Sequence, residues 1–219
     1  MLTSAAALTD GQVRAPSRLP RWSRGPVLTH LARSAGSRTR LLTAARTGAD
    51  LPQDRDEAER ESEITEGAGR PAAVLAQDLH SALHRSLAAA HSHPQDARDV
   101  PVRWLGAGLR PERGAVSSML REVHHTDLAA GHEPAHWPAP FVQREPSTVA
   151  AALNDRGDAP ALVLLADEDR VPRPIGDRAG PQASGPAAHL LGRLTGRIDG
   201  RTLTVGPPGP LVPVPARLK

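Results

Sequence analysis

The sequence predicts an α+β protein with an N-terminal four-helix bundle and a small C-terminal α/β domain. Long stretches of the first 130 residues repeat apolar side chains with helical spacing. Beyond the segment HEPAHWPAPF, short apolar runs bounded by Gly and Pro take over, a pattern typical of strands. Aromatic residues make up only 2% of the chain, so the core must be built mostly from Ala, Leu and Val, which favours helices packed through small residues.

The first long helix is expected over residues 24–47. Ser23 is a suitable N-cap, Pro26 is tolerated in the first turn, and Gly48 ends the helix. His30 lies beside its apolar stripe. That stripe consists of Val27, Leu28, Leu31, Ala35, Leu42 and Ala45.

Three further segments complete the expected bundle. Residues 51–69 are highly charged and indicate a short exposed helix or a loop, whereas residues 70–92 form a clear amphipathic helix. After a Pro-containing connection over residues 93–111, a last helix is expected over residues 112–130, with Gly131 as its stop. The stripe of the amphipathic helix is Leu75, Leu79, Leu83 and Leu87, and its His80, His84 and His91 are interpreted as a solvated flank. The inward residues of the last helix are Val116, Met119, Leu120 and Val123.

The C-terminal part has a different character. Residues 159–169 read as a buried strand, residues 184–200 as a helix that ends in glycine, and residues 201–206 as a second strand. The Pro-rich tail, residues 207–219, should be irregular. The boundary therefore falls near residues 138–150, and we assign residues 1–140 and 141–219 to the two domains.

Charge and composition exclude several classes of function. The net charge is only +3, and the arginines are spread along the chain among acidic residues, which argues against nucleic-acid binding. Without cysteine there is no disulfide, no Cys-ligated zinc and no protein thiol, so any sulfur chemistry needs a cofactor. No apolar run approaches the roughly 18 residues of a membrane span, and no signal peptide is recognisable. We expect a cytoplasmic monomer.

Four segments carry a resemblance to a known family. These are APSRLPRWSRGPVLTHLARSA, LLTAARTG, REVHHTDLAAGHEPAHWP and SGPAAHLLGRLTGR. They resemble, in the same order, the mycothiol-dependent maleylpyruvate isomerase family. The resemblance implies a DinB-like bundle with a small C-terminal domain. It also implies a zinc ion held by a His of an early helix and by a Glu and a His of the last bundle helix.

Within this resemblance, VLTHLA points to His30 as the first ligand. The family's second segment reads like R-E-V-E-V-H-H-V-D-L, with the Glu four residues before the ligand His and an Asp three residues after it. The chain has REVHHTDL, two residues shorter, so that counting back from Asp127 makes His124 the ligand and places Leu120 where the Glu belongs. Glu122 can be the third ligand only if the helix bulges.

Helix geometry, at about 100° per residue, specifies the side chains of this segment further. With Val123 and Asp127 inward, His124 lies at the edge of the inward face, Glu122 points away from it and His125 points outward. Asp127 should be paired, either to the second nitrogen of a ligand histidine or to an arginine or helix-capping partner.

The family resemblance implies a zinc- and mycothiol-dependent enzyme. Zinc deprotonates the thiol, the thiolate adds to the cis double bond of maleylpyruvate, and rotation and elimination give fumarylpyruvate. A related mycothiol S-transferase is equally compatible, and the alternative is a non-catalytic paralogue with an incomplete metal site that acts as a binding protein. Arg197 is the candidate for binding the substrate's carboxylates, with Arg193 and Arg201 as near alternatives. The expected partners are a small-molecule substrate and a low-molecular-weight thiol.

Overall fold

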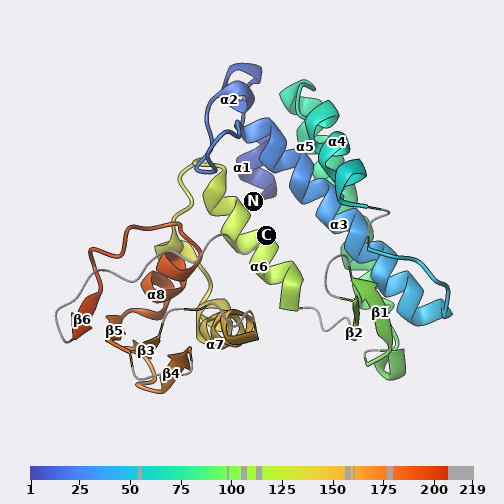
Figure 1. Ribbon diagram of the computed structural model, residues 1–219. Coiled ribbons are helices and arrows are strands. Elements are labelled where there is room, and N and C mark those ends of the chain that lie inside the picture. Colours follow the sequence, from blue (N-terminus) through green and yellow to red (C-terminus); the bar gives the residue numbers. More distant parts are fainter. Residues whose placement is uncertain are drawn as a thin grey trace. The chain divides into compact units, whose positions relative to one another are not determined.

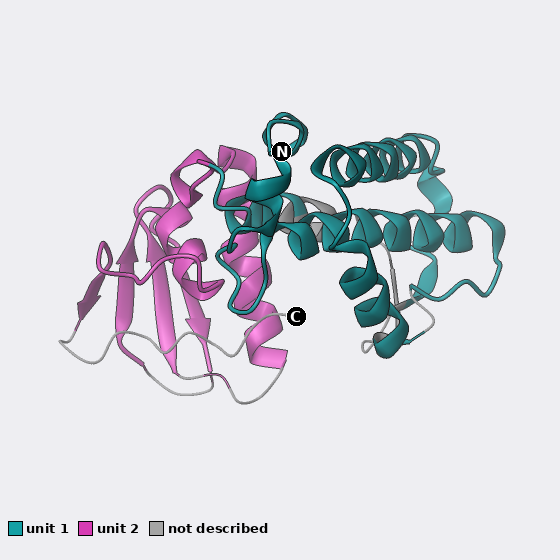
Figure 2. Ribbon diagram, turned by 90° about the horizontal axis from the view of Figure 1, so that it is seen from above, with its two compact units in different colours: residues 1–130 teal, residues 131–219 magenta. Residues whose placement is uncertain are grey.

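The computed structural model divides the chain into two compact units, Met1–Ala130 and Gly131–Lys219 (Figure 2). It describes residues 1–53, 56–97, 99–104, 108–111, 115–155, 159, 161–176 and 180–206, without the side chains of residues 57, 104, 108–111 and 115–120. The first unit is mainly helical, and the second combines helices with a small sheet. The predicted α+β class is therefore confirmed. The domain limits placed at residues 140 and 141 remain a prediction.

The first unit is arranged around α3 (Arg24–Thr47), which packs against α4 (Glu57–Gly67), α5 (Ala72–His91) and α6 (Ala115–Asp127) (Figure 1). These four helices follow the order predicted for the bundle. Two short helices precede them, α1 (Leu2–Ala6) and α2 (Asp10–Arg14), and neither was predicted from the sequence.

The ends of α3 are where the sequence places them. Ser23 is the N-cap residue with extended backbone, and Gly48 follows the last turn with φ of 68°, a left-handed conformation that glycine adopts without a steric cost. Between them the helix buries the predicted stripe and also Thr29 and His30. The burial on several sides fits a helix that contacts α2, α4, α5 and α6.

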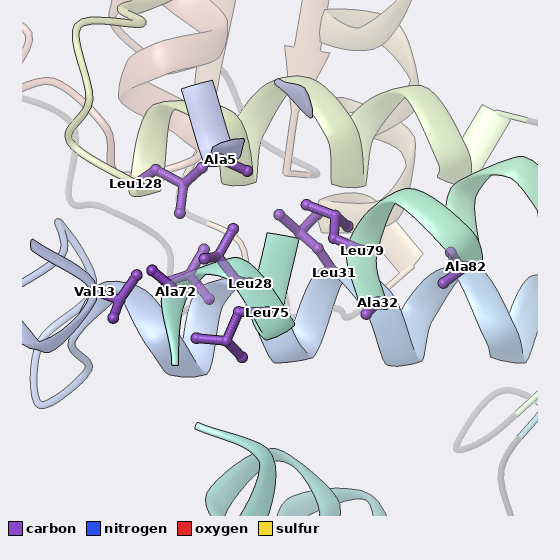
Figure 3. Packing of buried hydrophobic residues seen from close by; sticks show 12 residues of the cluster. Ala5, Val13, Leu28, Leu31, Ala32, Ala72, Leu75, Leu79, Ala82 and Leu128 are labelled. Atoms are coloured by element: carbon purple, nitrogen blue, oxygen red, sulfur yellow. The ribbon is translucent and has the colours of Figure 1, made fainter. Parts of the chain in front are cut away.

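The core of the first unit joins four helices and the residue that follows a fifth. Side chains from α1, α2, α3 and α5 meet Leu128, directly after α6, in one cluster (Figure 3). Its members are Ala5, Val13, Val27, Leu28, Leu31, Ala32, Ala35, Ala72, Leu75, Leu79, Ala82 and Leu128. They are all Ala, Val or Leu, as the scarcity of aromatic residues predicts. Along α5 the stripe is buried at Leu75 and Leu79 but reaches solvent at Leu87, and His80, His84 and His91 are exposed, which confirms the solvated flank.

The connection predicted over residues 93–111 contains regular structure. A 3-10 turn, η1 (Gln95–Ala97), precedes a two-stranded antiparallel hairpin of β1 (Pro101–Trp104) and β2 (Gly108–Pro111). The sequence predicted only a connection here and missed the hairpin, in which Pro101 and Pro111 pair with each other at the open end, a position that needs no central-ladder donor. Val102 packs with Leu41, Ala44 and Ala45 of α3.

The second unit has a four-stranded sheet in the order β4-β3-β5-β6. Strands β3 and β5 are parallel, with Leu164 opposite Ala183, and the two outer strands pair antiparallel to them. Helix α7 packs against β4 and α8, and α8 also contacts β3 and β5. The elements are η2 (Pro134–His136), α7 (Ala139–Asp155), β3 (Leu162–Ala166), β4 (Pro172–Ile175), β5 (Gln182–Gly185), α8 (Ala187–Leu194) and β6 (Thr204–Gly206).

Strand β3, helix α8 and strand β6 confirm the three predicted elements of this unit, while α7, β4 and β5 were missed. Helix α7 was hidden by its prolines, because Pro146 lies inside it. The tail predicted to be irregular, residues 207–219, lies outside the described residues. Among the helices that the structure describes, none is long and apolar enough to cross a membrane.

Candidate metal centre

Two of the predicted metal ligands meet between α3 and α6. The Nε2 atoms of His30 and His124 are 3.2 Å apart, and their rings lie edge to face with centroids separated by 4.7 Å. His30 is 7% exposed, so the pair is largely removed from solvent. Asp127, on α6 beside them, has no exposed surface.

The ends of the two helices are held together by Arg24, at the start of α3. Its Nε donates to the carbonyl oxygen of Leu128 at 2.6 Å, and its second terminal nitrogen donates to that of Ala129 at 3.0 Å. These carbonyls follow the last turn of α6 and would otherwise lack helical partners. The backbone N–H of Arg18 donates to the carbonyl of Asp127 at 2.9 Å. The register between His30 and His124 is thus fixed by contacts outside the histidine pair itself.

The hydrogen-bond partners define the protons on both imidazoles. Nδ1 of His124 lies 2.7 Å from Oδ2 of Asp127, a carboxylate that only accepts, so Nδ1 carries the proton and Nε2 has a free lone pair. Nδ1 of His30 lies 3.2 Å from a guanidinium nitrogen of Arg60, which only donates. His30 therefore carries its proton on Nε2 and donates it to His124. The bond from His124 to Asp127 is the first of the two pairings expected for Asp127.

The surroundings keep His30 neutral. Burial first, and then the neighbouring His124 and the positive charge of Arg60, lower its pKa from 6.5 to about 3, whereas Asp127 opposes the shift. A neutral imidazole is the form that binds a metal ion.

The spacing of the two Nε2 atoms fits a zinc ion. Two nitrogen ligands at about 2.0–2.1 Å from one tetrahedral zinc lie about 3.3 Å apart, close to the 3.2 Å between His30 and His124. Asp127 supplies the outer carboxylate that commonly orients a ligand histidine. The donor set is incomplete, however, because a catalytic zinc usually has three protein ligands.

Glu122, the third predicted ligand, is not gathered with the histidines. Helix α6 runs as a continuous α-helix over Ala115–Asp127, so no bulge turns Glu122 toward His30. Its Oε1 instead accepts a hydrogen bond from Nε of Arg121 at 2.8 Å. Across the described part of the chain, no three His, Cys, Asp or Glu side chains are placed to hold a metal together. Leu120, which counting back from Asp127 aligns with the family's Glu, has a side chain that lies outside the described residues.

The expectation that His125 faces solvent was wrong. His125 is 8% exposed and its Nε2 lies 2.9 Å from Oγ of Ser4 on α1, while Glu122 is 6% exposed and lies near the N-terminal amine of Met1. The predicted angular positions on α6 are compatible with this result. What the sequence did not reveal is that α1 covers that side of the helix.

The candidate catalytic arginine lies just after α8 in the second unit. Arg197 is half-buried, its backbone N–H donates to the carbonyl of Gly192 at 2.7 Å, and its guanidinium donates to the carbonyl of Thr195. Its alternative Arg201 is exposed and pairs with Asp199 at 3.0 Å, and Arg193 packs against Gly200. The role of Arg197 stays a prediction.

Sequence reasoning missed Arg60 as a member of the site. It belongs to the charged segment interpreted as a short exposed helix or loop, where one arginine among acidic residues carries no distinguishing signal. A helical reading of that segment would have placed Arg60, Ile64 and Gly67 on one face, at i, i+4 and i+7.

In the first unit, polar side chains from facing helices meet in a buried site. This arrangement is typical of helical-bundle proteins that bind a metal or another ligand in the bundle core. Residues 1–129 match the family model of the mycothiol maleylpyruvate isomerase N-terminal domain, and the chain belongs to this family.

Two solved structures have the same fold. The crystal structure of a mycothiol-dependent maleylpyruvate isomerase matches with a TM-score of 0.89 and 21% sequence identity, over 99% of this chain and 90% of that one. A histidine-to-alanine mutant of such an isomerase matches with a TM-score of 0.86 and 20% identity, over the same shares. No curated protein matches the sequence. At these identities the structures establish the fold.

Proposed function

We propose that this protein is a zinc- and mycothiol-dependent enzyme that isomerises maleylpyruvate or a similar cis-unsaturated acid, or transfers the thiol to a related electrophile. The family membership supports the thiol and the general reaction class. The single observation that supports the metal part is the 3.2 Å spacing of the two Nε2 atoms of His30 and His124 in a buried site.

His30 and His124 would hold the metal through Nε2, and Asp127 would keep His124 in the tautomer that leaves Nε2 free. When bound, zinc would lower the pKa of a thiol so that it reacts as a thiolate at neutral pH. The chain has no cysteine, so its own residues do not compete for that role. Arg197 is proposed to bind a substrate carboxylate, for which a guanidinium offers paired donors.

A second candidate is a non-catalytic paralogue that works as a binding protein. The observation that favours it is the undistorted α6, which keeps Glu122 on Arg121 and leaves two histidines as the ligands offered by the described residues. A two-ligand site should bind zinc more weakly than a three-ligand one.

Metal content and activity, measured on the same preparations, decide between these candidates. Zinc is measured by elemental analysis in the unmodified protein, His30→Ala and His124→Ala, with His84→Ala as the matched control because that histidine is exposed on α5. Each preparation is then assayed for conversion of maleylpyruvate to fumarylpyruvate with added mycothiol, and for consumption of mycothiol by model electrophiles.

The enzyme proposal expects near-stoichiometric zinc in the unmodified protein and in His84→Ala, and loss of zinc and turnover in the two site variants. Absence of zinc from the unmodified protein after reconstitution would exclude this mechanism. Bound zinc without turnover in either assay would favour the binding protein.

A further inference from the structure

Arg60 occupies the outer side of the histidine pair. It lies at the end of the first turn of α4. The N-terminus of this helix is capped by the side chain of Asp56, which accepts from the N–H of Glu59 at 2.6 Å. The guanidinium reaches across to α3 and donates to Nδ1 of His30 at 3.2 Å. The side chain is half-buried, in a helix whose other polar side chains are mostly exposed.

The packing of α4 brings Arg60 to this position. Arg60, Ile64 and Gly67 share one face of α4, at i, i+4 and i+7. Ile64 is buried, and a Cβ atom at Gly67 would come within 2.6 Å of Cγ2 of Thr29, the residue before His30. The glycine therefore lets α4 approach α3 closely, and Arg60 extends from the same face two turns earlier.

This hydrogen bond is incompatible with a metal on His30. The guanidinium can only donate, so it needs the lone pair of Nδ1 and leaves the proton on Nε2. A metal ion on Nε2 requires the proton to move to Nδ1, where it would face the N–H donor of Arg60. The positive charge of Arg60 also repels a divalent cation at short range. The hydrogen bond from Arg60 and its positive charge thus both oppose metal binding at His30.

We propose that Arg60 is a latch that opposes metal binding: the pair His30–His124 binds a metal through both Nε2 atoms only when the guanidinium has left Nδ1 of His30. This inference rests on the proposed function for the identity of the metal site, and it concerns a regulatory residue that contacts a ligand, not the metal. The latch explains why His30 and His124 are both in place although a hydrogen bond joins their Nε2 atoms.

The test measures zinc affinity, by competition with a chromophoric chelator, for the unmodified protein, Arg60→Gln and Arg60→Glu. Gln offers a carbonyl and Glu a carboxylate that accept from Nδ1–H, and outer-shell partners of this kind change metal affinity by about 10- to 100-fold. We expect about tenfold tighter binding in Arg60→Gln and a larger gain in Arg60→Glu. Arg85→Gln, on the exposed side of α5, removes the same charge away from the site and should leave the affinity unchanged.

A second readout does not depend on metal. In the metal-free protein, nitrogen-15 shifts of the imidazole should place the proton of His30 on Nε2, and on Nδ1 in Arg60→Glu, with circular dichroism confirming that both proteins are folded. Unchanged zinc affinity in both Arg60 variants, while the unmodified protein binds zinc, would overturn the latch alone. Absence of zinc binding in every variant would overturn the latch together with the proposed metal site.

Discussion

At the scale of single residues, the bond between Asp127 and His124 determines how the site can act. Asp127 is fully buried, and its carboxylate accepts from Nδ1 of His124 at 2.7 Å. Asp127→Asn keeps the shape but removes the charge that fixes the tautomer, so zinc affinity should fall by about 10- to 100-fold. Chelator competition measures this loss, and Asp96→Asn, at an exposed position, is the control. Equal affinities in the two variants would show that Asp127 does not orient the ligand.

A second prediction at this scale concerns Asp169 in the turn between β3 and β4. Its pKa is lowered from 3.8 to about 2, first by the hydrogen bond from the Arg173 side chain and then by the N–H of Val171. A lowered pKa means that the ionised pair stabilises the fold above pH 3.8 and that this contribution is lost as the pH falls through about 2. Arg173→Gln should raise the pKa of Asp169 toward 3.8.

Carboxyl carbon shifts, followed by NMR as the pH is lowered, report the pKa of Asp169 directly. Arg170→Gln is the matched control, because Arg170 belongs to the same turn but pairs with Asp167, at 3.6 Å. A pKa that stays near 2 in Arg173→Gln would assign the shift to the backbone donor instead.

At the scale of elements, helix α3 was predictable because its signals are local. Ser23, the apolar stripe and Gly48 lie within the helix or at its ends. Helix α1 has five residues and too few periods to give a pattern, and α7 carries a proline in its interior. In the site, His30 and His124 were found from the resemblance, whereas Arg60 was not. Its role depends on the packing of α4 against α3, a non-local contact that the spacing of one segment does not encode.

Helix α1 should stabilise the bundle through the hydrogen bond between Ser4 and the buried imidazole of His125. Ser4→Ala removes the partner of a buried ring nitrogen, at 2.9 Å, and should lower the free energy of unfolding by about 1 kcal/mol. Thr3→Ala is the control. It changes an exposed residue of the same helix and, like Ser4→Ala, raises the helix propensity. Urea unfolding followed by circular dichroism compares them. If both variants are equally stable, the bond between Ser4 and His125 contributes nothing measurable.

At the scale of the whole molecule, the two units differ in the side chains that pack in their interiors. The second unit contains the chain's single Phe, Phe141, which meets Trp137 edge to face with centroids 5.5 Å apart. The main cluster of the first unit consists of Ala, Val and Leu. In a close-packed core of small side chains, each large aliphatic residue fills a large share of the volume. The stability of the first unit should therefore depend strongly on its few large aliphatic residues.

Leu79 provides the test of that dependence. It is fully buried in the middle of α5, whereas Leu87, two turns later on the same stripe, is 51% exposed. Leu79→Ala should cost about 2–5 kcal/mol through lost burial and the remaining cavity, and Leu87→Ala should stay within about 0.5 kcal/mol of the unmodified protein. Urea unfolding at neutral pH measures both. A small cost at Leu79 would mean that neighbouring alanines close the cavity, and that this core is more adaptable than its burial indicates.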